Sequence, residues 1–386
     1  MKKISQYIIF TILLLSIFAA CDSAINDDPR PQTESAPSSR LSELLGASDV
    51  AGYSMADRPR RFDFPADHGA HPGYRNEWWY LTGNLDAASG GRFGYELTLF
   101  RFSLTPGNER STASNWETNQ VWVGHFAITD VNAGKFHVGQ RYSRGAAGLA
   151  GATDTPVHVW LDDWSIKSPD GGTSWQLQAL ERDVELSLTL EAAKQVVLNG
   201  TNGLSQKSAR PGNASYYYSI PRLATSGEIR VDGETKRVSG LSWLDREWGS
   251  SALSRDQVGW DWFALQLSDG TDLMFYTLRR LDGSADEHSS GTWIDANGRA
   301  DHLQKSDVII EVTGYWQNER GKSYPSGWQI VIPSKALSIR VSPVLDDQEL
   351  VTNVRYWEGA VDVEGESGSG VVEGRGYVEL TGYASE

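Results

Sequence analysis

Four carboxylates lie within runs of tryptophan, where an acid side chain could act on an apolar molecule. Glu77 precedes a pair of tryptophans, Asp261 lies between two, and Asp245 and Glu247 flank an arginine in a third tryptophan-rich segment. A carboxyl group in an apolar pocket has a raised pKa, so it can hold a proton at neutral pH and serve as a general acid. We therefore take Asp245, Glu247 and Asp261 as candidate catalytic residues.

The aromatic residues around these acids fall on shared faces of two expected strands. Residues 78–85 and 260–267 repeat one another, so that Trp78 matches Trp260 and Tyr80 matches Trp262. Alternate residues of a strand face the same side of a sheet, and each stretch therefore presents a broad aromatic face suited to a large, mostly apolar ligand. The candidate ligand-binding residues are Glu77, Trp78, Tyr80, Arg246, Trp248, Trp260 and Trp262.

Two purely structural explanations compete with a ligand site. Aromatic side chains fill cores well in strands, so every tryptophan could be packing. In addition, Arg246 could pair with Glu77 or Asp261 in a buried ion-pair network that has no catalytic part. A protein built only in this way would be a protein-binding scaffold without a continuous cavity.

Short alternating apolar runs between glycine turns predict an all-β protein. Residues 184–190 and 328–332 alternate in polarity, and the 39 glycines include turns at 89–91 and 268–270. The internal repeat predicts two tandem lipocalin-like antiparallel β-barrels, each able to close around one elongated ligand. We place the N-terminal domain at residues 61–235 and the C-terminal domain at 236–386.

The amino terminus has the three parts of a secretory signal. Lys2 and Lys3 precede an apolar run over residues 7–18, which is too short to cross a bilayer as a helix, and small residues follow. Cys21, the only cysteine of the 386 residues, lies where a bacterial lipoprotein is cleaved and acylated. Residues 1–20 are therefore predicted to be a lipoprotein signal peptide. Simple secretion with a leftover thiol is the alternative.

The segment after Cys21 predicts a lipid-anchored protein. Residues 21–60 are rich in Ser, Pro, Asp and Ala, which is typical of a flexible tether. Asp22 favours retention at the inner membrane in enterobacterial sorting, so we expect the folded body at the periplasmic face of that membrane. The net charge of −15 argues against nucleic-acid binding. We expect no cofactor and no metal site.

Six segments together resemble one known family over nearly the whole chain after the tether. They are residues 76–80, 124–130, 243–248, 256–262, 355–360 and 376–383. The resemblance is to the AttH and carotenoid 1,2-hydratase (hydroxyneurosporene synthase) family, whose members are also described as lipocalin-like predicted secreted hydrolases. It implies two lipocalin-like domains in tandem, and it adds His125 and Tyr276 to the candidate ligand-binding residues.

The resemblance implies one of two functions. The AttH kind is associated with an ABC transport system, whereas the hydratase kind adds water across the terminal double bond of an acyclic carotene. The hydratase pattern Asp-His-Asn-Trp-Gly matches residues 245–249, with Arg246 in place of the histidine. Further on, Tyr276 matches a hydratase tyrosine, but Leu278 stands where hydratases carry a catalytic aspartate.

We therefore expect a membrane-anchored AttH-like lipoprotein that binds an apolar or amphipathic lipid or isoprenoid. Its expected partners are this hydrophobic small molecule and the permease or ATPase subunits of an ABC-type export system. The alternative is an acid-catalysed hydratase, a hydro-lyase acting on a double bond of an acyclic isoprenoid or carotenoid.

Overall fold

The computed structural model describes residues 50–107 and 116–383. The expected signal peptide, Cys21 and most of the expected tether lie outside this part of the chain. The tether was expected to continue to residue 60, but the chain is bound to the folded body from Tyr53 onward. The Tyr53 hydroxyl donates to the Ser103 carbonyl at 2.9 Å, and Arg60 pairs with Asp67 at 2.7 Å. Within the described ranges, none of the helices has the length and apolarity needed to cross a membrane.

Two antiparallel sheets account for most of the described residues, which confirms the all-β class. The first sheet has 13 strands. In chain order they are β1 (Asn76–Ala87), β2 (Arg92–Ser103), β3 (Gln120–Asp130), β4 (Lys135–Arg144), β5 (Ala150–Asp154), β6 (Val157–Leu161), β7 (Trp164–Ser168), β8 (Ser174–Glu181), β9 (Val184–Ala192), β10 (Val197–Leu198), β11 (Leu204–Gln206), β12 (Ala214–Val231) and β13 (Glu234–Gly249).

The second sheet has ten strands and follows the first along the chain. It contains β14 (Gln257–Leu267), β15 (Asp272–Arg280), β16 (Ser290–Ile294), β17 (Ala300–Gln304), β18 (Ile309–Val312), β21 (Trp328–Ile332), β22 (Leu337–Pro343), β23 (Glu349–Val351), β24 (Arg355–Ser367) and β25 (Gly370–Leu380). In the described ranges, the other elements are the hairpin of β19 (Tyr315–Gln317) and β20 (Ser323–Pro325) and the short 3-10 helices η1 (Ala66–His68), η2 (Lys305–Asp307) and η3 (Pro333–Lys335).

The internal repeat corresponds to matching hairpins at the centre of each sheet. The first sheet has the order β4-β3-β2-β1-β13-β12-β9-β8-β7-β6-β5, and the second has β17-β16-β15-β14-β25-β24-β22-β21-β18. The hairpins β1–β2 and β14–β15 carry the two tryptophan runs, and their turns contain Gly90 and Gly270, which have φ values of +89° and +84°. The two tandem lipocalin-like units expected from the repeat are therefore present.

The first sheet extends further along the chain than the boundary at residues 235–236 implies. That boundary falls inside β13, which pairs with β1 from Asn76 opposite Gly249 to Ala87 opposite Val238. Starting each unit at its tryptophan strand overlooked this returning strand. Sheet membership changes between Gly249 and Gln257.

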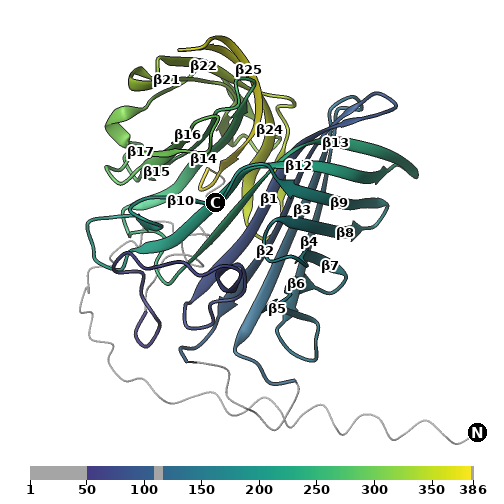
Figure 1. Cartoon of the computed structure of the whole chain (residues 1–386), viewed down its shortest axis with the longest axis vertical. Helices are drawn as coiled ribbons and strands as arrows, with labels where there is room; N and C mark the ends of the chain where they lie inside the picture. The colour runs from purple at the N-terminus through teal and green to yellow at the C-terminus, as the bar shows by residue number, and fades with distance from the viewer. Residues whose placement is uncertain (1–49, 108–115, 384–386) are drawn as a thin grey trace, which may run out of the picture. The chain divides into compact units, whose positions relative to one another are not determined.

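The two sheets pack against each other along β1 and β2 of the first and β24 and β25 of the second (Figure 1). Strands far from this interface alternate between buried and exposed residues, as in β9. In contrast, β1, β2, β13 and β14 are buried over most of their length, because one face covers the core of their own sheet and the other faces the opposite sheet.

Candidate active site

A cavity of about 240 Å³ lies between the two sheets and receives side chains from both. Trp78 and Tyr80 of β1 enter it from the first sheet, and Trp260 and Trp262 of β14 enter it from the second. The remaining lining residues are Phe100, Phe102, Leu104, Val121, Val123, His125, Tyr142, Lys207, Tyr217, Asp245, Glu247, Ala252, Tyr276, Leu278, Val354, Tyr356, Glu379 and Thr381.

The position of this cavity corrects the expectation of one ligand cavity inside each barrel. The interior of the first sheet is filled by tryptophans, among them Trp79, Trp122 and Trp175, each at most 1% exposed. The repeated aromatic faces that alternation predicted are instead the outer faces of the two central hairpins. They meet across the interface, where the ring centres of Tyr80 and Trp262 are 5.0 Å apart in an edge-to-face arrangement.

Asp245 of β13 is a carboxyl group with a full set of hydrogen-bond donors. Ser219 donates to its Oδ1 at 2.5 Å, the Trp243 indole donates to the same atom at 2.6 Å, and the Tyr217 hydroxyl donates to Oδ2. Burial raises the pKa of Asp245 to about 7, since it outweighs the three donors that favour the carboxylate. The Trp262 indole donates in turn to the Tyr217 hydroxyl at 3.1 Å and holds it in place.

Glu247, two residues further along β13, forms an ion pair in the same cavity. Lys207 lies 3.0 Å from its Oε1, and the Ser215 hydroxyl donates to that oxygen. Burial alone would lower the pKa of Lys207, but the charge of Glu247 and the Tyr276 hydroxyl raise it above its ordinary value. The Lys207 ammonium also lies 4.2 Å from the centre of the Tyr276 ring. Lys207 therefore adds a fixed positive charge to the cavity wall.

Glu379 of β25 is a cavity residue that the sequence analysis did not single out. Its carboxyl group lines the cavity from the second sheet and is half-buried there. Removal from bulk water raises its pKa to about 8, with further contributions from the charges of Glu247 and Asp245. Glu379 lies inside the segment 376–383, which carried part of the family resemblance, but a single glutamate in an apolar strand has no spacing signal of its own. Asp245 and Glu379 thus place one protonatable carboxyl in each sheet.

The other expected ligand-binding residues that line the cavity are His125 and Tyr276. The His125 Nδ1 atom is 2.6 Å from the Tyr356 hydroxyl, and Gln140 is hydrogen bonded to its other ring nitrogen. Burial lowers the pKa of His125 to about 3, so the ring is neutral at physiological pH. Tyr276 is held by the hydroxyls of Ser205 and Ser290, each at 2.8 Å.

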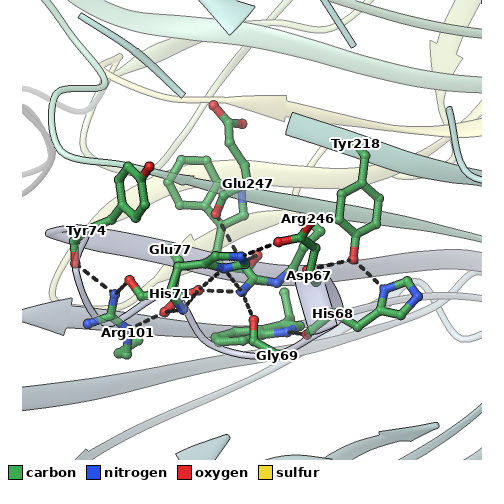
Figure 2. Close-up of polar contacts among 12 residues, drawn as sticks. Asp67, His68, Gly69, His71, Tyr74, Glu77, Arg101, Tyr218, Arg246 and Glu247 are labelled. Atoms are coloured by element: carbon green, nitrogen blue, oxygen red, sulfur yellow. Dashed lines mark hydrogen bonds and ion pairs between the residues drawn. The ribbon is translucent and has the colours of Figure 1, made fainter. Parts of the chain in front are cut away.

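Glu77, Arg246 and Trp248 do not line the cavity, which corrects their place among the expected ligand-binding residues. Glu77 and Trp248 occupy the strand positions next to those that face the cavity, so they point to the opposite side of the sheet. Figure 2 shows Glu77 held between Arg101 and Arg246, while the Glu247 side chain points away from this group.

The acids and bases around Glu77 form a buried structural network. His71 stacks on Trp248 with ring centres 3.8 Å apart, and its ring nitrogens lie 3.0 Å from Asp67 and 3.3 Å from Glu77. Burial alone would raise the pKa of Glu77, but the two guanidinium groups hold it well below its ordinary value. The pairing of Arg246 with Glu77 is the ion pair that the sequence suggested.

Asp261, the third candidate catalytic residue, also lies away from the cavity. It alternates with Trp260 and Trp262 and therefore faces the other way, where Arg279 pairs with it at 2.8 Å and the Tyr383 hydroxyl donates to it at 3.0 Å. The structure thus brings Asp245 and Glu247 together and separates them from Asp261.

Comparison with known proteins identifies relatives of this architecture. The family model described as AttH-like matches residues 55–383. A crystal structure from Nitrosomonas europaea, described as an AttH candidate, is 32% identical, covers 86% of this chain and 100% of its own, and superposes with a TM-score of 0.76.

One sequence relative and one structural neighbour carry enzyme names. "Dehydratase asqC" of Emericella nidulans is 26% identical over 239 residues, which is 55% of this chain, and the match spans only 62% of that relative's length. Kievitone hydratase from Nectria haematococca is 17% identical with a TM-score of 0.65, over 89% of this chain and 99% of its own, and this likeness concerns the fold.

Proposed function

This chain belongs to the AttH-like family, and we propose that it adds water to, or removes water from, a carbon–carbon double bond of an apolar or amphipathic molecule. One observation carries the proposal. Two carboxyl groups whose pKa values lie near neutrality, Asp245 at about 7 and Glu379 at about 8, enter one aromatic cavity from opposite sheets. The name of the relative, a dehydratase, supports this reaction class, and the hydratase shares the fold.

In the hydration direction Glu379 is the acid. Its O–H bond breaks and the proton forms a new C–H bond at one alkene carbon, which leaves a cation at the more substituted carbon. The faces of Trp78, Trp260 and Trp262 can stabilise that cation by roughly 1–2 kcal/mol for each desolvated ring. Leu278 stands at the position of the hydratase aspartate and has no acidic group. In this proposal Glu379, which lines the same cavity, supplies the acid instead.

Asp245 is the base of the same reaction. Water attacks the cation, a C–O bond forms, and the proton lost from that water passes to the Asp245 carboxylate. Tyr217 and Ser219 hold this carboxylate in position. The charge of Asp245 also raises the pKa of Glu379, so ionisation of the base helps the acid to keep its proton. Dehydration follows the same steps in reverse.

Incubation with acyclic isoprenoids in heavy water tests this function. We would use squalene, lycopene and shorter terpenes, and we expect a product heavier by one water that carries deuterium on carbon. Asp261→Asn is the matched control, because Asp261 lies outside the cavity and its variant should keep the activity. Failure of all alkenes and of the corresponding tertiary alcohols to react, with a folded protein, would refute the proposal.

Transport of a bound ligand is the second candidate function, and the rim of the cavity favours it. Leu104 and Tyr142 line the cavity and remain 60% and 47% exposed, so an apolar molecule could pass between the cavity and another hydrophobic site. A lipid anchor at Cys21 and service to an ABC-type exporter remain part of this proposal. Native mass spectrometry of the purified chain tests it, since a carrier should retain a lipid or isoprenoid even in Asp245→Asn.

A further inference from the structure

A second group of carboxyls lies next to Glu379 but outside the cavity wall. Glu358 of β24 is the direct cross-strand partner of Glu379, and such partners have their side chains on the same face with Cβ atoms about 4.5–5.5 Å apart. The Tyr80 hydroxyl, which belongs to the first sheet and lines the cavity, donates to Glu358 Oε1. Glu358 is therefore adjacent to both walls of the site.

The first sheet contributes a further acid to this group. On β2, Thr98 is opposite Tyr80 and Glu96 is opposite Thr82, so Glu96 lies one step further along the same face. The sheets touch closely at this level, because a Cβ atom added at Gly94 would lie 2.6 Å from the Ala360 Cβ. Across the interface, the charge of Glu379 adds to the burial that raises the pKa of Glu96.

These side chains are buried, and most of their polar atoms have no hydrogen-bond partner. Glu96 and Glu358 are 0% exposed and Tyr377 is 1% exposed. Among the described residues, neither oxygen of Glu96, nor Glu358 Oε2, nor the Tyr377 hydroxyl has a hydrogen bond of standard geometry. Buried polar atoms are costly without partners, and several of them on facing strands could be satisfied by a shared proton or an ordered water.

The group also reaches a second opening of the interface. Moving away from the cavity along the same face, Glu379 is succeeded on β25 by Tyr377 and then Arg375. On the antiparallel strand β24, Glu358 is succeeded by their partners Ala360 and Asp362. Arg375 and Asp362 line a polar groove between the sheets. Since same-face residues are about 6.6–6.8 Å apart along a strand, the buried group occupies the interval between the cavity and the groove.

We propose that Glu96 and Glu358 form a proton-transfer path that resupplies Glu379. The inference rests on the proposed function, in which Glu379 is the acid. When Glu379 has given its proton to the alkene carbon, Glu358 passes its own O–H proton to the Glu379 carboxylate. Glu358 then receives a proton from Glu96, which regains one through the groove. Each transfer breaks one O–H bond and forms another, and no oxidant or reductant takes part.

The acid strengths suit such a path. Burial raises the pKa of Glu96 to about 8, close to that of Glu379, so a proton can move between the two with little change in free energy. Burial, with the charges of Glu379 and Glu96, raises the pKa of Glu358 well above its ordinary value, which keeps the middle group protonated. The hydroxyls that face the group, Tyr80 and Tyr377, have raised pKa values as well and stay neutral.

The first test measures coupling without any substrate. Carbon-13 NMR of glutamate carboxyls in the full chain would follow the titration of Glu379, assigned with Glu379→Gln. We expect a broad curve in the wild type and a narrower one in Glu96→Gln, with the midpoint lowered by roughly one pH unit, while the effect of Asp245 remains in both. The control is Glu366→Gln. Glu366 is an exposed glutamate on β24, the strand of Glu358, and its substitution should leave the curve unchanged. Identical curves in wild type, Glu96→Gln and Glu358→Gln would overturn the proposal even if the chain proves to be a hydratase.

The second test measures turnover with a substrate found by the alkene incubations. We expect Glu358→Gln to lower kcat by roughly tenfold or more, with KM unchanged and a larger solvent isotope effect, because glutamine cannot release a carboxyl proton. Glu358→Asp should recover part of the rate. Coupled titration with wild-type kcat and isotope effect in Glu358→Gln would reject the path. Coupled titration in a chain that hydrates nothing would instead retain the cluster and reject the proposed function.

Discussion

The acid–base pair of the cavity depends on how each carboxyl is surrounded. Asp245 accepts hydrogen bonds from three donors, which partly offset its burial, and its pKa is raised to about 7. Glu379 has less compensation, and its pKa is raised to about 8. Near pH 7.5 many molecules therefore contain an ionised Asp245 beside a protonated Glu379, which is the combination that the proposed hydration needs.

Removal of the base should abolish most of the activity. We expect Asp245→Asn to lower kcat by about 10²–10⁴-fold, because the amide accepts no proton from the attacking water. Steady-state kinetics at pH 7.5 would measure this loss, with Asp261→Asn as the control of equal charge change outside the cavity. Equal rates in the two variants would exclude Asp245 as the base.

The pH dependence of the reaction should be a narrow bell. Hydration falls below about pH 7 as Asp245 gains a proton, and it falls above about pH 8 as Glu379 loses one. Rates of kcat/KM between pH 5 and 10 would define both limbs. Because Glu379→Gln has lost the acid, its rate should be low at every pH and should not fall further above pH 8.

At the scale of elements, strand alternation separates chemistry from structure within single strands. On β13, Asp245 and Glu247 face the cavity while Arg246 faces the network around Glu77. On β14, Trp260 and Trp262 line the cavity while Asp261 pairs with Arg279 on the other side. Each central strand therefore carries a reactive or aromatic face and a face of buried ion pairs.

The network around Glu77 should contribute strongly to stability and little to the reaction. Glu77→Gln removes the charge that compensates Arg101 and Arg246, so we expect a loss of about 3–5 kcal/mol in the free energy of unfolding. Denaturant unfolding would measure it. Glu185→Gln is the matched control, because its pair with Arg230 is 43% and 36% exposed at the two side chains and should contribute less than about 1 kcal/mol. A Glu77→Gln chain as stable as wild type would contradict this role.

Much of this strand-level arrangement could be predicted from the sequence, and the exceptions have physical causes. Strand alternation correctly predicted that Trp78 and Tyr80 share one face of the sheet, as do Trp260 and Trp262. It also predicted that Arg246 points to the face opposite Asp245. The same rule should have excluded Glu77 and Asp261 from the cavity, but their acidity beside tryptophans outweighed it. Glu379 could not be found, because its role depends on which sheet face meets its strand, and that is decided by packing between residues far apart in the chain.

At the scale of the whole molecule, the two sheets are joined by polar contacts in both directions. Asn84 of the first sheet donates to the Gly376 carbonyl at 2.9 Å, and Gln266, its repeat equivalent, donates to Pro221 and Ser242 of the first sheet at 2.8 and 3.0 Å. Lys194 and Arg222 both pair with Asp272 across the same interface, each at 2.6 Å. These contacts fix the distance between the walls of the cavity.

Stability should fall on each side of a mildly acidic optimum. The folded pKa of Glu77 is lowered, so its contribution is present above its unfolded pKa and is lost in strong acid as the pH falls through the folded value. The folded pKa of Glu96 is raised to about 8, so its contribution is complete below the unfolded pKa near 4.5 and is lost as the pH rises toward 8.

Glu96→Gln should therefore stabilise the protein at pH 8 and have little effect at pH 4.5. The expected gain in the free energy of unfolding at pH 8 is on the order of a few kcal/mol, because a buried amide never has to ionise. The facing groups, Glu358, Glu379 and Tyr377, are unchanged in this variant. Urea unfolding at the two pH values would measure the difference. Parallel pH profiles for variant and wild type would show that Glu96 does not titrate on unfolding.

If the chain were cut between Gly249 and Gln257, each fragment would keep only one wall of the cavity. Asp245 would stay with one piece and Glu379 with the other, and each piece would carry its own uncovered aromatic wall into water. In the proposed reaction, neither fragment alone would hold both the acid and the base. Catalysis should return only on their reassembly, which would make the chemistry a property of the joined pair and not of either repeat.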